Sequence, residues 1–219
     1  MLTNLKIKKG STLVKILKFA EINFINPQLI LFIGLNGAGK SSLLQAISST
    51  LKPNETNGKY KGDVILTFKN DENPKLLEFA SRVDNGKYRG YLEDVTLDIK
   101  CLFSSEGESN LLSFRHFVTQ KLVPQLEKKT PVLLIVDELD SGLSVNYVIS
   151  MGSLLKKLTD QYPNLQLIMS ANQYELIRLF KSSTIALPSG EYLELNSYQD
   201  FLEWYIHKHN ELYKTPSKK

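Results

Sequence analysis

Three short apolar runs mark the most buried parts of the chain. They lie at residues 29–33, 132–136 and 165–169 and read LILFI, VLLIV and LQLIM. A run of this length between polar segments is typical of a strand that is buried on both faces. Each run is followed by a segment with apolar residues at helical spacing. The pattern therefore predicts an α/β fold, with a mixed central sheet flanked by helices.

Further elements are predicted around these runs. Residues 2–8 and 12–25 are rich in β-branched and aromatic side chains and predict two or three strands, an N-terminal antiparallel β lobe. Residues 63–69 predict one more strand, and 183–195 a hairpin-like pair around a Pro-Ser-Gly turn. Helices are expected at 42–51, at 109–128 with Ser109 as N-cap and Pro124 as a kink or break, at 145–160, at 173–181 and at 197–214.

Length and composition fit one domain. The chain has 219 residues, a net charge of +4 and one cysteine, Cys101, so no internal disulfide can form. We expect a single domain over 1–214, with a signature-bearing helical insertion at about 70–128 and a flexible basic tail at 215–219. No apolar run approaches the ~20 residues that span a bilayer, and no secretory leader is visible. We therefore expect a cytoplasmic protein with no membrane contact.

The segment Gly34–Ser41, GLNGAGKS, fits the phosphate-binding loop G-x-x-x-x-G-K-[ST]. It follows a predicted buried strand and opens a predicted helix, as that motif requires. Glycines let the backbone N–H groups wrap a phosphate, the lysine reaches the β- and γ-phosphates, and the serine hydroxyl can ligate Mg²⁺. The sequence thus predicts binding of a nucleoside triphosphate, ATP with Mg²⁺. The candidate binding residues are Gly34, Asn36, Gly37, Ala38, Gly39, Lys40, Ser41 and Ser42.

An acidic pair, Asp137 and Glu138, ends the second apolar run. Ligands of open α/β sheets sit at the carboxyl ends of the strands. Asp137 is therefore a candidate Mg²⁺ residue together with Ser41, and Glu138 is a candidate catalytic residue that orients or deprotonates the attacking water.

Three motifs in this order resemble those of the ABC-type ATPases, a superfamily that includes transporter subunits, SMC-type proteins and compact RecF- or OLD-like ATPases. Asn36 stands at a position typical of that loop, DELDSGLS at 137–144 resembles Walker B plus D-loop, and SEGES at 105–109 resembles the signature motif. The resemblance implies a homodimer, or a larger homo-oligomer, with ATP sandwiched between one chain's phosphate loop and the signature residues Ser105, Gly107 and Glu108 of the other. It also implies that residues 140–142 contact the partner.

Two positions depart from that family pattern. Asn172 stands where the family has a switch histidine, and it can hydrogen-bond but cannot carry a proton. No glutamine lies between Gln45 and Gln120, so the family's Q-loop ligand is missing, and Asp84 or Asn85 could supply an oxygen instead. Both changes favour slow hydrolysis, with Asn172 as a third candidate catalytic residue beside Glu138 and Lys40.

These features predict an ATPase that switches a partner, an effector protein or DNA, in phage defence or DNA maintenance. The alternative is a nucleotide-gated scaffold that hydrolyses ATP very slowly or not at all, and a third option is the ATP-binding subunit of a transporter. Basic residues at 82–91 and 214–219 either contact nucleic acid or are solvated. For adenine stacking, Phe19 and Phe24 are both candidates.

Overall fold

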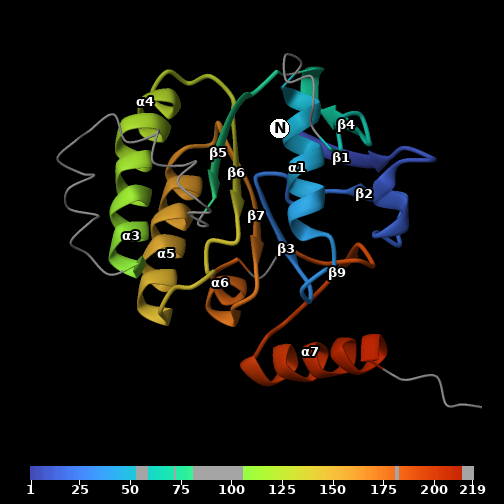
Figure 1. The fold of residues 1–219 in the computed structure, drawn as a ribbon. Helices are drawn as coiled ribbons and strands as arrows, with labels where there is room; N and C mark the ends of the chain where they lie inside the picture. Colours follow the sequence, from blue (N-terminus) through green and yellow to red (C-terminus); the bar gives the residue numbers. More distant parts are fainter. Residues whose placement is uncertain (53–58, 72, 81–105, 181–182, 214–219) are drawn as a thin grey trace, which may run out of the picture.

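The computed structural model describes residues 1–52, 59–71, 73–80, 106–180 and 183–213 (Figure 1). Predictions that concern Ser105, Cys101, the loop at 82–91 or the tail at 215–219 fall outside these described residues.

Six strands form the central sheet, in the order β5-β6-β7-β3-β8-β9. The three apolar runs are its central strands, β3 (Leu29–Ile33), β6 (Val132–Asp137) and β7 (Leu165–Ala171). They run parallel, with Ile33 opposite Ala171 and Val136 opposite Met169. Their carboxyl ends therefore meet at one edge of the sheet, the edge at which α/β sheets bind ligands.

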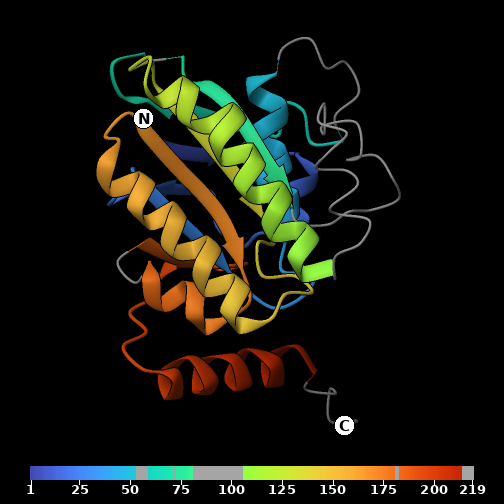
Figure 2. The ribbon, with the colours of Figure 1, turned by 90° about the vertical axis from the view of Figure 1, so that its left-hand side faces the viewer.

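Side chains of these strands alternate between two hydrophobic cores. Leu31, Leu134 and Leu167 face one core, beneath the helices α3 and α5. Phe32 and Ile135 face the other, beneath α1 and the N-terminal lobe. The two views of the fold show this layering, with α3 and α5 on one face of the sheet and α1 on the other (Figures 1 and 2).

Shorter strands complete both edges of the central sheet. β5 (Lys75–Ala80) pairs in parallel with β6, and β8 (Thr184–Ala186) pairs in parallel with β3. β9 (Glu191–Tyr192) is antiparallel to β8, which confirms both the mixed sheet and the predicted hairpin. The segment 70–128, expected as a helical insertion, thus contributes an edge strand as well as a helix.

The N-terminal lobe is an antiparallel sheet, as predicted. β1 (Leu2–Ile7) lies between β2 (Glu21–Asn23) and β4 (Val64–Phe68). The prediction of strand from residue 12 is wrong, because residues 12–15 form a 3₁₀ turn. Asp63 fixes this turn by accepting hydrogen bonds from Thr12 N and Thr12 Oγ1, at 3.1 and 2.6 Å.

The helix predicted at 109–128 begins earlier and is not broken. α3 (Glu106–His116) continues through a π-helical segment, Phe117–Leu122, into α4 (Val123–Leu126). Ser109 is therefore inside the helix rather than its N-cap. Pro124 directly follows the π-helical segment, at the second residue of α4.

The remaining helices agree with the predicted ones to within a few residues. They are α1 (Lys40–Leu51), α5 (Val145–Gln161), α6 (Tyr174–Leu179) and α7 (Tyr198–Tyr213), and a short 3₁₀ turn covers Lys69–Asp71. α7 is attached by aromatic packing, with the ring centroids of Phe201 and Tyr174 5.8 Å apart. Within the described ranges, none of the helices has the length and apolar character that a membrane span needs.

Candidate nucleotide-binding site

The predicted phosphate loop joins the buried end of β3 to the start of α1, and each of its glycines has a structural reason. A Cβ on Gly34 would lie 2.7 Å from the carbonyl oxygen of Leu187. Gly37 and Gly39 have φ of +82° and +93°, the left-handed region that other residues rarely adopt. A Cβ on Gly37 would meet nothing within 4 Å, so the loop backbone there faces open space.

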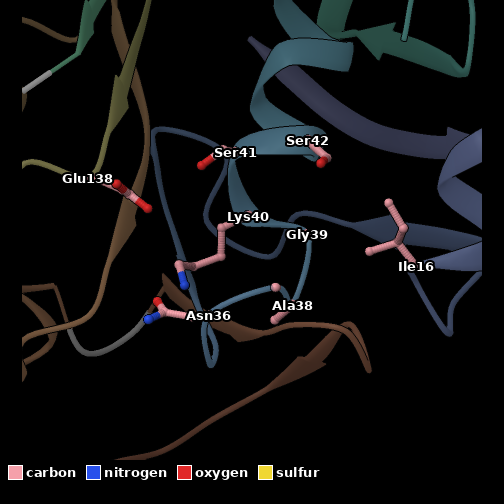
Figure 3. A pocket seen from close by; sticks show the side chains of 9 residues that line it. Ile16, Asn36, Ala38, Gly39, Lys40, Ser41, Ser42 and Glu138 are labelled. Atoms are coloured by element: carbon pink, nitrogen blue, oxygen red, sulfur yellow. The ribbon is translucent and has the colours of Figure 1, made fainter. Parts of the chain in front are cut away.

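This space is a pocket with two chemically different ends. It is lined by loop and helix residues 36–42, which include Asn36, Ala38 and Ser42, by Glu138 and by Ile16. Glu138 lies on one side of the loop and Ile16 on the other (Figure 3). The pocket thus has a carboxylate at one end and an aliphatic side chain at the other.

Lys40 connects the end of the loop back to its beginning. Its ammonium donates to the carbonyl oxygen of Gly34 at 2.6 Å and to that of Leu35 at 3.3 Å. Burial lowers the pKa of Lys40, while the charges of Glu138, Asp140 and Asp137 oppose this shift. The ammonium is thus buried and held at the loop by two carbonyl oxygens.

Ser41 and Asp137 are brought together, as the predicted Mg²⁺ site requires. Ser41 Oγ donates to Asp137 Oδ1 across 3.2 Å, although 96 residues separate them in the chain. A hydroxyl and a carboxylate are the hard oxygen ligands that Mg²⁺ takes, so the pair fits this cation. These two residues would hold it.

Ser170 is a site residue that the sequence analysis missed. It lies on β7, between the strands that carry Asp137 and the phosphate loop, and is fully buried. Its hydroxyl donates to Asp137 Oδ1 at 2.6 Å and accepts the N–H of Glu138 at 2.8 Å. The available signal was a hydroxyl inside an otherwise apolar strand, because such a buried group needs a polar partner.

Glu138 has a backbone conformation that favours a functional role over a structural one. Its φ is +48°, unusual for a residue with a side chain, and residues held this way cluster at active sites. The turn is stabilised from both sides, by Ser170 and by the N–H of Ser141, which donates to Glu138 O at 3.0 Å. The side chain is thereby directed to the pocket.

Asn172 and Asp140 are linked directly. Asn172 follows β7, and its backbone N–H donates to Asp140 Oδ2 at 2.6 Å. The expectation that Asp140 contacts a partner chain is wrong for this residue, because only 3% of its surface is exposed. Gly142, in the same loop, is exposed and remains available to a partner.

Neither phenylalanine proposed for adenine stacking lines the pocket. Phe24 is buried against Phe32. Phe19 packs against Gly190, and a Cβ on that glycine would lie 2.7 Å from the ring of Phe19. Ile16, an aliphatic residue, does line the pocket. Ser42, at the loop's end, donates its hydroxyl to the Tyr60 hydroxyl at 3.0 Å.

The described signature residues are not at this pocket. Gly107 and Glu108 lie in the first turn of α3, on the face of the sheet opposite α1 (Figure 2). Gly107 allows close packing there, because a Cβ would lie 3.0 Å from the ring of Tyr147 on α5. The structure therefore brings together the phosphate loop, Asp137 and Glu138, and leaves the signature residues apart. Asn172 lies next to Asp140 and is not among the residues that line the pocket.

A metal centre built from protein residues alone finds no support. Among the described residues, no group of three or more His, Cys, Asp or Glu side chains could hold a metal ion. His207 pairs instead with Glu211 on α7, with 3.2 Å between Nε2 and Oε1.

Comparison with known proteins gives a family match over most of the chain. Residues 13–213 match the family model described as an AAA domain. The chain is also 30% identical over 189 residues to an uncharacterized ABC transporter ATP-binding protein of Methanocaldococcus jannaschii. That alignment covers 71% of this chain and 61% of the relative, so the chain spans about three fifths of the relative's length.

Solved structures share the fold at low sequence identity. A nucleotide-free ATP-binding cassette from an ABC transporter aligns with a TM-score of 0.55 and 11% identity, covering 94% of this chain and 96% of that one. The cbiO1 protein of Clostridium perfringens, part of an ABC transporter complex, aligns with a TM-score of 0.55 and 16% identity, covering 98% of this chain and 96% of that one. The SMC head domain of Thermotoga maritima aligns with a TM-score of 0.50 and 14% identity, covering 90% of this chain and 99% of that one. The predicted fold of an ABC-type ATPase is confirmed.

Proposed function

This chain belongs to the AAA domain family and has the fold of an ABC-type ATPase, and we propose that it binds ATP with Mg²⁺ and hydrolyses ATP. The observation that carries this proposal is the contact of Ser41 with Asp137, at 3.2 Å, beside Glu138 and the phosphate loop. A hydroxyl, two carboxylates and the backbone N–H groups of the loop lie close together here, and this supports the proposal.

Each residue has a distinct part in the proposed reaction. The loop N–H groups and Lys40 bind the phosphates. Ser41 and Asp137 would hold the cation, which would supply positive charge beside the phosphate oxygens. Glu138 orients a water molecule and accepts its proton as the water oxygen bonds to the γ-phosphorus. The bond between that phosphorus and the β–γ bridging oxygen breaks, so that ADP and phosphate leave.

We propose that two chains form an ATP-sandwiched dimer. Gly107 and Glu108 begin α3 on the far face of the sheet from α1, so a chain cannot place them at its own phosphate loop. A second chain can present its α3 N-terminus to the open side of the pocket, where the helix dipole favours an anion. Ser105 is assigned to the same interface by the motif alone.

We propose slow, switch-like turnover. Asn172 is hydrogen-bonded to Asp140, two residues after Glu138, and its side-chain amide can orient a water or a phosphate oxygen but cannot relay a proton. A slow ATPase is suited to holding a partner between two states. From the motif resemblance we propose an effector protein as that partner, in phage defence or DNA maintenance.

The first test is ATP turnover and oligomeric state of wild type and Glu138→Gln. We expect wild type to release phosphate, and Glu138→Gln to form a dimer stabilised by ATP with turnover reduced at least 100-fold. Glu203→Gln, on the exposed face of α7, is the matched control and should behave as wild type. Absence of ATP binding would refute the proposal, whereas dimerisation without hydrolysis in wild type would favour a nucleotide-gated scaffold.

A further inference from the structure

Asp140 is a buried carboxylate with an unusual set of partners. Its Oδ2 atom accepts two consecutive backbone N–H groups, those of Asn172 at 2.6 Å and Gln173 at 2.5 Å. In addition, Gln173 Nε2 donates to the backbone carbonyl oxygen of Asp140 at 3.2 Å. Asp140 and the two residues after β7 are therefore joined by three hydrogen bonds.

These bonds connect two loops that carry different site residues. The turn after β6 carries Glu138, two residues before Asp140, and the segment after β7 carries Asn172. A second connection is made within β7, where the hydroxyl of Ser170 donates to Asp137 and accepts the N–H of Glu138. The segments at the ends of β6 and β7 are thus joined by hydrogen bonds at two places, one at Ser170 and one at Asp140.

Stability alone does not account for a carboxylate at this position. Burial of a charged group is costly, and a neutral side chain of similar shape commonly serves stability as well or better. Burial raises the pKa of Asp140, and the N–H groups of Asn172 and Gln173 oppose that shift. In addition, Asp140 Oδ1 has no hydrogen-bond partner among the described residues. The carboxylate is held from one side only, by the residues after β7.

We propose that Asp140 is a positioning residue that fixes Asn172 relative to Glu138, the acidic residue that lines the pocket. The inference rests on the proposed function, in which both residues act in ATP hydrolysis. Asp140 itself does not line the pocket, so its effect passes through the backbone of Asn172. A shift of either loop is then transmitted to the other.

A double-mutant cycle in the full chain tests this route. Asp140→Ala should lower kcat at least tenfold, with less than a threefold change in KM and in the Kd for ATP. In the Asn172→Ala background the same substitution should lower kcat less than twofold, because the residue it positions is gone. Asp140→Asn keeps an acceptor oxygen and should recover most of the lost kcat. Additive effects of the two alanine substitutions would overturn the proposal.

Amide hydrogen exchange in the nucleotide-free protein separates this inference from the proposed function. The N–H groups of Asn172 and Gln173 should exchange at least tenfold faster in Asp140→Ala than in wild type. Asp160→Ala, at an exposed aspartate of α5 that pairs with Lys156, is the control and should leave both rates unchanged. If Asp140→Ala does not fold, Asp140→Ser takes its place in both experiments.

The outcomes are distinguishable. A wild type without turnover contradicts hydrolysis, and the exchange rates then decide the link between the loops on their own. Unchanged exchange at Asn172 and Gln173 would refute the link even if wild type hydrolyses ATP.

Discussion

The side-chain amide of Gln166 binds both backbone groups of Leu2, although 164 residues separate the two. Its Oε1 accepts the N–H of Leu2 at 2.6 Å and its Nε2 donates to the Leu2 carbonyl at 2.9 Å. The same Nε2 also donates to the carbonyl of Pro27 at 2.5 Å. Gln166 lies on β7 and is 2% exposed, so this contact attaches the first strand of the lobe to the central sheet.

Gln166→Leu should therefore destabilise the fold. The substitution leaves three backbone groups without their partner, two of them buried, and we expect the free energy of unfolding to fall by about 2–4 kcal/mol. Urea denaturation monitored by circular dichroism measures this. Gln199→Leu, on the exposed surface of α7, should change stability by no more than about 0.5 kcal/mol. Equal effects of the two substitutions would contradict a specific role of Gln166.

Ser170→Ala should weaken the dependence of ATP turnover on Mg²⁺. Asp137 loses a hydrogen bond to its charged carboxylate, worth about 1.5–3 kcal/mol, and Glu138 N–H loses its acceptor. We expect the Mg²⁺ concentration for half-maximal activity to rise about tenfold, measured by titration at saturating ATP. Ser150→Ala, at an exposed position of α5, is the control. An unchanged Mg²⁺ titration would show that Ser170 does not orient Asp137.

Lys40 should give the stability of the nucleotide-free protein a specific pH dependence. Burial lowers the pKa of Lys40 below its ordinary value of 10.5. Between the lowered pKa and 10.5, the unfolded chain binds a proton that the folded chain has released, so rising pH favours folding by up to about 1.4 kcal/mol per pH unit. Lys40→Met lacks this contribution. Urea midpoints of wild type should therefore rise relative to Lys40→Met as pH approaches 10.5, and parallel profiles would exclude the shift.

We expect a pocket lined by Ile16 to bind nucleotides with different bases about equally well. An aliphatic side chain contacts the face of a base without reading its edge, so we expect ATP and GTP to bind with Kd values within about threefold, a difference below 1 kcal/mol. Ile16→Ala should weaken both nucleotides about fivefold and leave tripolyphosphate unaffected, as measured by calorimetry. Val14→Ala, at a side chain 51% exposed on the same turn, is the control. A strong preference for ATP would contradict this reading of Ile16.

Mixed dimers should show whether the signature residues act on the other chain. Lys40→Ala and Gly107→Asp should each abolish turnover alone. When mixed, they form one site with an intact loop from one chain and an intact α3 start from the other, so part of the activity should return. Equal stability of the variants, checked by thermal unfolding, is the control. No recovery on mixing, with both variants folded, would contradict the sandwich.

The local parts of the site were predictable from the sequence. The phosphate loop occupies consecutive residues between a buried strand and a helix, and the conformations of Gly37 and Gly39 depend only on that segment. Asp137 and Glu138 were found for the same reason, because they end an apolar run. Strand and helix positions followed from periodicity. At residues 12–15, where the strand prediction failed, the backbone is held by Asp63, which is 51 residues away from Thr12 in the chain.

Only the tertiary structure decided which residues meet across the sheet. The strand order places β7 between β6 and β3, which brings Ser170 to Asp137 and Asp140 to Asn172. Nothing in the spacing of these residues encodes that order, because pairing between distant strands depends on packing of the whole chain. The same holds for the opposite faces occupied by α1 and α3. The sequence thus determined the nucleotide chemistry, and the packing of the sheet determined how its residues are held.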